Sequence, residues 1–197
     1  MNAAETAVIL IEFQNDFCKE GGKLHDLVKG EIARKNTVEN AVALTRIARR
    51  KGCLVVHCPF VYDPEWASEC AVCGIIAGAG DAGAFLAGRW GSEFIEELQP
   101  ADGEPVLEGK HALSGFTNTD LHEILRKNRV RNVILAGFLS NVCVEATAFS
   151  AYDLGYRVRI ATEATASASE KIQDYVETEI YPLLGGSITL EEFEDIE

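Results

Sequence analysis

The sequence predicts a three-layer αβα fold on a doubly wound, mainly parallel sheet of about six strands, of the Rossmann-like class. Short β-branched runs alternate with longer stretches of helical period, which is typical of strand–helix–strand crossover units. The 197 residues have the length of one ordinary domain, and no internal repeat is visible. We therefore expect a single domain over residues 1–197.

Six short apolar runs are predicted to be the strands. Their length suits strands that are buried on both faces of a parallel sheet. The runs are Val8 to Ile11, Leu54 to Cys58, Pro105 to Leu107, Val133 to Ala136, Arg157 to Ala161 and, with the weakest pattern, Ser187 to Leu190.

Four stretches between these runs have the spacing of amphipathic helices. The first is expected to end at Gly52, because three basic residues just before that glycine complement the negative end of a helix dipole. Thr119 can cap the second helix with its side chain. The predicted ranges are about Glu31 to Lys51, a helix after Thr119, Cys143 to Gly155, and roughly Glu170 to Leu184.

Two segments lie outside this alternation. The stretch from Glu65 to Gly103 is rich in Gly, Ala and Cys, and a long excursion of this kind is more often a pocket-lining insertion than a domain. Within it, Gly78 to Gly83 matches G-x-G-x-x-G without a convincing strand before it, so we predict a flexible loop over the site. The acidic end from Glu191 to Glu197 is predicted to be solvated.

Charge and composition limit the classes of partner. Eighteen basic and 31 acidic residues give a net charge of −13, whereas a phosphate-binding face needs clustered Lys and Arg. The first apolar run is far shorter than the roughly 20 residues that cross a bilayer. We therefore expect a soluble, cytoplasmic protein with a small-molecule partner, and neither nucleic acid nor membrane.

Three residues with chemical potential follow three different predicted strands. Glu12 follows the first strand, Lys110 comes shortly after the third, and Cys143 lies just beyond the fourth. In an open parallel sheet, ligands bind beyond the carboxyl ends of the strands, so these side chains are expected at one edge. An acid, a cation and a thiol together are the parts of a covalent thiol hydrolase, although each residue alone also has an ordinary structural explanation.

The expected role of Lys110 follows from magnitudes. A free thiol has a pKa near 8.5, and lowering it to about 6.5 takes roughly 2.7 kcal/mol. A helix N-terminus contributes only about 0.3 to 1 kcal/mol, whereas an ammonium group in contact offers roughly 4 kcal/mol before desolvation is subtracted. We therefore predict that Lys110 holds Cys143 ionised.

At these residues the chain resembles the isochorismatase-like cysteine hydrolases, a superfamily that includes nicotinamidases, N-carbamoylsarcosine and ureidoacrylate amidohydrolases, and isochorismatase itself. The resemblance runs through most of the chain, and its motifs occur in the same order. They are Val8-Ile-Leu-Ile-Glu-Phe-Gln-Asn-Asp-Phe17, Lys110 with Ser114-Gly-Phe116 and Thr119-Asp-Leu121, Gly137-Phe-Leu-Ser-Asn-Val-Cys-Val-Glu-Ala-Thr-Ala148, and Asp153-Leu-Gly-Tyr-Arg-Val158.

The resemblance implies roles for particular residues. A catalytic triad of acid, lysine and cysteine is carried over to Glu12, Lys110 and Cys143. It also implies a cis peptide between Phe138 and Leu139, and an oxyanion hole made by the backbone N–H groups of Leu139 and Cys143. By resemblance alone, the protein is expected to be a homo-oligomer.

The sequence departs from the family pattern at two places. The family usually has Asp at the acid position, and Glu12 is one methylene longer, so the site must be rearranged or impaired. The metal-binding nicotinamidases carry Asp-x-His after the second strand, where this chain has His57-Cys-Pro-Phe-Val-Tyr62. We therefore expect no metal, no cofactor, and a substrate other than nicotinamide.

The predicted function is a metal-independent cysteine hydrolase that cleaves a C–N bond of a small amide, carbamoyl or ureido compound through a thioester. Two alternatives stay open: a catalytically impaired ligand-binding or regulatory member, and a vinyl-ether hydrolase of isochorismatase type. Thiol redox chemistry through Cys70 and Cys73, or a zinc site there with His57 and Cys58, is a weaker alternative. The aromatic candidates for substrate contact are Phe17, Phe60, Trp90 and Phe116.

Overall fold

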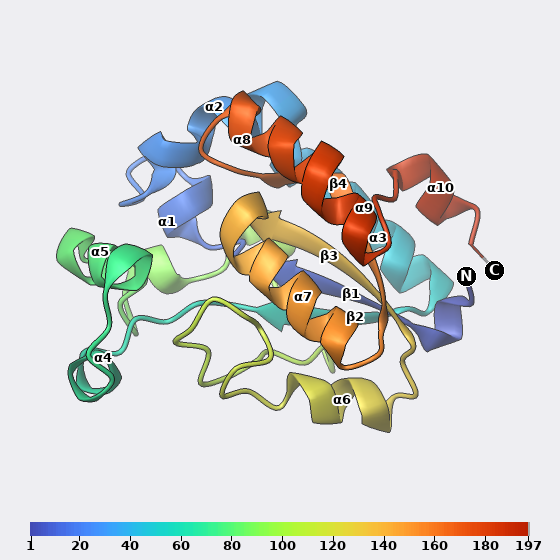
Figure 1. Cartoon of the computed structure of the whole chain (residues 1–197), viewed down its shortest axis with the longest axis horizontal. Coiled ribbons are helices and arrows are strands. Elements are labelled where there is room, and N and C mark those ends of the chain that lie inside the picture. Colours follow the sequence, from blue (N-terminus) through green and yellow to red (C-terminus); the bar gives the residue numbers. More distant parts are fainter. Residues whose placement is uncertain (197) are drawn as a thin grey trace.

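The computed structural model describes residues 1–196 as a parallel sheet covered by helices on both faces (Figure 1). The sheet has four strands in the order β2-β1-β3-β4, all parallel. Their bounds are β1 Thr6–Ile11, β2 Leu54–Cys58, β3 Asn132–Phe138 and β4 Arg157–Ala166. The αβα architecture and four of the six predicted strands are thus confirmed.

The prediction of about six strands is wrong, because the other two runs each make only a single bridge. Val106 pairs with His57 at the β2 edge, and Ser187 pairs with Ile160 at the β4 edge. Both bridges are parallel, so they continue the sheet by one residue each without forming a strand. The chain turns away from the sheet on either side of these contacts.

The strands are apolar on both faces because each face supports its own hydrophobic core. Val8 and Leu10 of β1 belong to one core cluster, whereas Ala7, Ile9 and Ile11 belong to the other. All six residues of β1 and all seven of β3 are buried. This is the continuous apolar pattern that a parallel sheet between two helical layers requires.

The first predicted helix is in fact two helices, α2 His25–Lys35 and α3 Thr37–Lys51. Asn36 separates them in the left-handed conformation (φ 51°), which Asn tolerates better than most residues. The predicted end at Gly52 is confirmed, since Gly52 is the left-handed C-cap of α3. The second predicted helix is α6 Leu121–Lys127, and the hydroxyl of Thr119 accepts a hydrogen bond from the N–H of Leu121.

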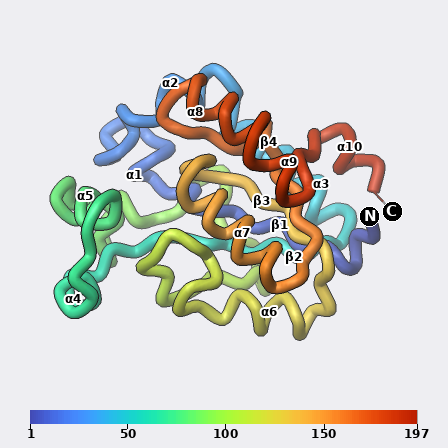
Figure 2. Tube along the Cα trace, viewed as in Figure 1, coloured from blue at the N-terminus to red at the C-terminus, as the bar shows by residue number. Residues whose placement is uncertain are grey.

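The two C-terminal predicted helices contain π-helical turns. One consists of η4 Ser140–Val144 and α7 Glu145–Asp153, so it begins before Cys143. The other consists of α8 Glu170–Tyr175, η5 Val176–Ile180 and α9 Tyr181–Leu184, which follow one another along one path (Figure 2). The α6, α7, η5 and α9 elements contribute to the core cluster on the Ile9 face of the sheet.

The segment from Glu65 to Gly103 is mostly short helices and turns. These are α4 Pro64–Glu69, α5 Gly74–Ala82, η2 Trp90–Ser92 and η3 Glu96–Leu98, and the remaining short elements of the chain are η1 Ala3–Glu5 and α1 Asn15–Cys18. The loop predicted over Gly78 to Gly83 is wrong, because Gly78 lies inside α5. In Figure 1, α4 and α5 lie at the end of the molecule away from both labelled termini.

The described acidic side chains of the C-terminal end are exposed, as predicted, but the segment is a packed helix and not a tail. Residues Leu190–Glu194 form α10, capped by Thr189 and Glu192 in a reciprocal capping box, and the side chain of Phe193 is fully buried. Contacts between α10 and α3 explain that burial. The Thr-x-x-Glu spacing of Thr189 and Glu192 is the sequence pattern that indicates the start of this helix. Glu197, the last residue of the predicted tail, lies outside the described residues.

Gly137 permits the close approach of β3 to β1. Its φ is +126°, and a Cβ placed there would lie 1.9 Å from the carbonyl oxygen of Ile11. Only glycine adopts this backbone conformation readily and leaves room for the neighbouring strand. The carboxyl ends of the two central strands therefore depend on this residue.

We expect the Gly137→Ala substitution to lower the free energy of unfolding by about 2 kcal/mol or more, because strain and overpacking act together. Gly30→Ala is the matched control: Gly30 lies exposed in α2 with open space around its Cβ position, and alanine there should stabilise by about 0.5 to 1 kcal/mol. Urea denaturation measures both. Equal urea midpoints of unfolding for Gly137→Ala and the unsubstituted protein would contradict the close approach of β3 to β1 at this residue.

Candidate active site

Glu12 occupies a strained position directly after β1. Its φ is 59°, in the left-handed region that a residue with a long side chain seldom adopts. The backbone N–H of Glu12 donates to the carbonyl of Cys58 (3.1 Å) at the end of β2, and the residue is 3% exposed. Backbone strain of this kind is concentrated at functional sites, where surrounding contacts hold it in place.

Lys110 is a buried cation that pairs with this acid. Its Nζ forms a salt bridge and a hydrogen bond with Oε1 of Glu12, and it lies 5.1 Å from the centroid of the Phe60 ring. The residue is 1% exposed. Burial by itself lowers the pKa of Lys110, but the Glu12 carboxylate and the nearby thiols outweigh it and raise the pKa well above its usual range. Lys110 is therefore a permanent cation.

Cys143 lies on the π-helical turn η4, which follows β3, and its thiol faces both partners. Burial raises its pKa most; the charge of Glu12 and a hydrogen bond with that carboxylate raise it further, and only Lys110 opposes them. The net effect keeps Cys143 protonated at neutral pH. The prediction that Lys110 holds Cys143 ionised is wrong for this arrangement, because Lys110 is already neutralised by Glu12 and the thiol is desolvated.

The structure thus brings Glu12, Lys110 and Cys143 together at the carboxyl ends of the strands, where the sequence predicted them. The peptide between Phe138 and Leu139 is cis, as the resemblance implied. Of the two residues predicted to form the oxyanion hole, Leu139 lines the cavity beside this cluster and Cys143 does not. The catalytic roles of these residues stay predictions.

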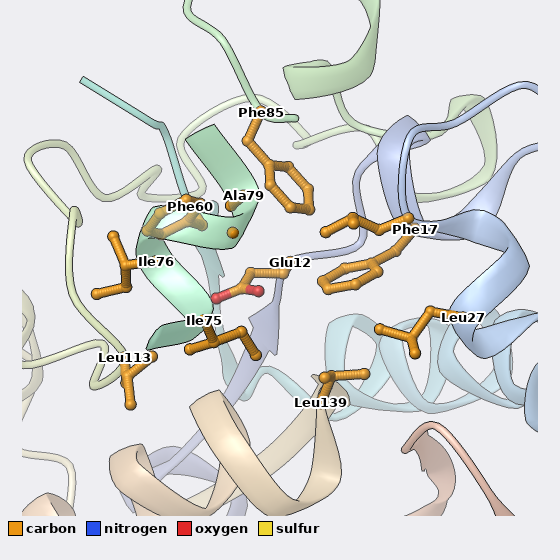
Figure 3. A pocket seen from close by; sticks show the side chains of 12 residues that line it. Glu12, Phe17, Leu27, Phe60, Ile75, Ile76, Ala79, Phe85, Leu113 and Leu139 are labelled. Atoms are coloured by element: carbon orange, nitrogen blue, oxygen red, sulfur yellow. The ribbon is translucent and has the colours of Figure 1, made fainter. Parts of the chain in front are cut away.

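An apolar cavity of about 260 Å³ opens beside this cluster (Figure 3). The carboxylate of Glu12 points into it, surrounded by apolar side chains. Phe17 and Phe60 form part of its wall, and so does the inserted segment, through Ile75, Ile76, Gly78, Ala79 and Phe85. The predicted pocket-lining insertion is therefore observed.

Two predicted substrate contacts do not line this cavity. Trp90 is 49% exposed and lines a separate surface depression with Asn15, Lys19 and Glu93. Phe116 stacks on Tyr156 (centroids 6.1 Å apart) in the core beneath α7. Their roles as substrate contacts stay predictions, because aromatic composition identifies residues that bury surface but not the face on which they do so.

Three polar residues after Glu12 hold backbone segments in and beside the cavity wall, and the sequence analysis did not single them out. Gln14 is fully buried; its amide donates to the carbonyl of Phe60 (2.9 Å) and accepts from the Phe60 N–H (2.9 Å). Asn15 donates to the carbonyl of Trp90 (2.8 Å). Asp16 accepts from the N–H of Phe85 (2.6 Å), which holds Phe85 in a left-handed conformation (φ 56°) in the cavity wall. Three consecutive polar residues after a buried strand were the available signal.

A second thiol lies against the same charged pair. Cys58 ends β2, and burial raises its pKa to about 12, while Lys110 lowers it and Glu12 raises it. The neighbouring His57 hydrogen-bonds to Glu104 (2.8 Å), and Cys70 and Cys73 are exposed free thiols.

Within residues 1–196, no group of three or more His, Cys, Asp or Glu side chains is arranged to hold a metal ion. In the same residues, no helix is long and apolar enough to cross a bilayer.

Comparisons with known proteins agree with this geometry. A family model described as "Isochorismatase domain" matches residues 6–192. Ureidoacrylate amidohydrolase RutB of Agrobacterium fabrum is 31% identical over 84% of this chain and 77% of its own length. An Arabidopsis thaliana protein named "Probable inactive nicotinamidase" is 29% identical over 85% of this chain and 83% of its own. The crystal structure of an isochorismatase family protein from Desulfovibrio vulgaris superposes with a TM-score of 0.83 at 25% identity, covering 97% of each chain.

The protonation state of Cys143 can be measured by iodoacetamide alkylation followed residue by residue with mass spectrometry. Because the pKa of Cys143 is raised, its alkylation should be slow at pH 7 and still be rising at pH 9. Glu12→Gln removes the negative charge, so it should speed alkylation at pH 7 by roughly tenfold, the factor for one pH unit of pKa. A rate that levels off below pH 7 would show an ionised thiol instead.

Proposed function

The chain belongs to the isochorismatase domain family, whose named relatives include amidohydrolases, and we propose that it is a cysteine hydrolase that cleaves a C–N bond of a small amide, carbamoyl or ureido compound. The observation that carries the proposal is the buried cluster of Glu12, Lys110 and Cys143 beside an open apolar cavity that Glu12 lines. A thiol, a base and a fixed cation within reach of one bound molecule are what acyl transfer requires.

Acylation begins from the neutral thiol. Glu12 accepts the proton of Cys143 as the sulfur attacks the substrate carbonyl carbon, and Lys110 stabilises the negative charge that appears on sulfur. The carbonyl oxygen becomes an oxyanion, which the backbone N–H groups of Leu139 and Cys143 are proposed to stabilise. When the intermediate collapses, the C–N bond breaks, Glu12 returns the proton to the leaving nitrogen, and the acyl group remains on sulfur as a thioester.

Deacylation uses the same carboxylate. Glu12 removes a proton from a water molecule, whose oxygen attacks the thioester carbon. The C–S bond then breaks, the acid leaves, and the proton on Glu12 returns to the Cys143 sulfur. Each turnover therefore consumes one water and restores the neutral thiol. Lys110 keeps its charge throughout, which fits its strongly raised pKa.

A second candidate is a member of the family that binds a ligand and has lost turnover. Two observations favour it: Glu12 stands where the family usually has Asp, and one similar plant protein carries the word "inactive" in its name. Against it, the longer side chain of Glu12 is fully paired with Lys110 and reaches the thiol, so the methylene is accommodated.

The first test is ammonia release from a panel of small amides, ureas and carbamoyl compounds. We expect Cys143→Ala to abolish release, because the nucleophile is gone, and Cys70→Ala to leave it unchanged, because Cys70 is exposed and outside the cavity. Undiminished release in Cys143→Ala would refute the proposed nucleophile.

The two candidates differ in the effect of Glu12→Asp. The backbone of residue 12 is fixed by its hydrogen bond to Cys58, so the shorter side chain withdraws the carboxylate from Lys110 and Cys143 by about 1.5 Å, one C–C bond. Misplacement on this scale costs about 10- to 100-fold in kcat, which is the loss we expect for the hydrolase. A gain in kcat would instead support an impaired member that the family residue repairs.

A further inference from the structure

The wall of the active-site cavity is almost entirely apolar. Twelve residues of the described part of the chain line it, and Glu12 is the only one of them with a charged or polar side chain. The other eleven are Phe17, Leu24, Leu27, Phe60, Ile75, Ile76, Gly78, Ala79, Phe85, Leu113 and Leu139. A bound molecule would therefore meet one carboxylate and otherwise hydrocarbon.

The nearby cation is not free to bind a substrate anion. Lys110 is 1% exposed, forms its ion pair with Glu12, and lies next to the ring of Phe60 instead of lining the cavity. A carboxylate in this cavity would lose its hydration without gaining a cationic partner, and it would be repelled by Glu12. Burying an unpaired charge in apolar surroundings is among the most unfavourable arrangements in proteins.

The size and shape of the cavity indicate what the apolar part of a substrate can be. Phe85 packs edge to face against both Phe17 (5.1 Å between centroids) and Phe60 (5.6 Å), which gives one rigid aromatic side. Aliphatic side chains form the other side. A dry cavity of about 150 Å³ is known to hold benzene, so the present 260 Å³ fits a ring or a branched chain together with an amide group.

We propose that the substrate is an uncharged primary amide or urea with a compact apolar substituent, and that compounds with a carboxylate at the far end are excluded. This inference rests on the proposed hydrolase function and specifies its substrate class. It separates this chain from its relative RutB, because ureidoacrylate, named as that protein's substrate, carries a carboxylate. Leu27 and Ile75 are 45% and 49% exposed, so they form the part of the wall nearest to solvent.

Matched pairs of compounds test the proposal. In each pair a carboxylate replaces an isopropyl group of the same shape: 4-methylpentanamide against succinamic acid, and 3-methylbutylurea against 3-ureidopropionate. We expect the neutral member of each pair to have a kcat/KM about a hundredfold higher or more, because only the anion is desolvated without a partner. Equal values, or a preference for the acids, would overturn the substrate class.

The outcome is separable from that of the proposed function. If the acids are preferred and Cys143→Ala abolishes turnover, the hydrolase stands and the substrate class is wrong. If turnover survives in Cys143→Ala, the proposed nucleophile is wrong. If none of the four compounds is hydrolysed, calorimetric titration of Cys143→Ala decides: binding of the neutral members alone supports the substrate class, and binding of the acids, or of none of the four, overturns it.

A charge introduced at the rim provides a second readout. Leu27→Lys adds a cation to the cavity wall at a side chain that already reaches solvent, so the preference should move toward succinamic acid by about tenfold or more. The matched control is Leu183→Lys in α9, which is 66% exposed and does not line the cavity, and which should leave the preference unchanged. An identical shift in both variants would mean that net charge, and not the cavity wall, sets the preference.

Discussion

The ion pair between Glu12 and Lys110 is the interaction on which the site depends. Both side chains are almost completely removed from solvent, so each is tolerated only because the other is present. Removing one partner from such a pair leaves a buried charge uncompensated, at a cost of about 3 to 5 kcal/mol. The pair therefore fixes the end of β1 against the segment that carries Lys110, although those residues are far apart in the chain.

The same pair sets the chemistry of the third residue. Because Lys110 is neutralised by Glu12, its field does not ionise Cys143, and burial keeps the thiol protonated at rest. The carboxylate is then the group that can take the thiol proton when a substrate arrives.

The cavity walls are held by backbone hydrogen bonds from the residues that follow Glu12. Gln14 hydrogen-bonds to the backbone of Phe60, and Asp16 to that of Phe85. One short segment therefore positions two of the three aromatic residues that line the cavity. The same segment of the chain connects the acid at the end of β1 to these two aromatic walls of the cavity. The side chains of Gln14 and Asp16 bond to the backbone behind the wall and do not line the cavity. The cavity surface can therefore stay apolar apart from the Glu12 carboxylate.

How much the sequence determined depends on whether a feature is local. Apolar runs such as Val8 to Ile11 required a strand buried on both faces, and the positions of Glu12, Lys110 and Cys143 after strands required them to share one edge. Whether Pro105 to Leu107 becomes a strand or one bridge, whether Phe116 faces a core or a cavity, and whether Phe193 docks on α3 depend on distant neighbours. The charge state of Cys143 belongs to the same group, since desolvation exists only after the chain has packed around the thiol.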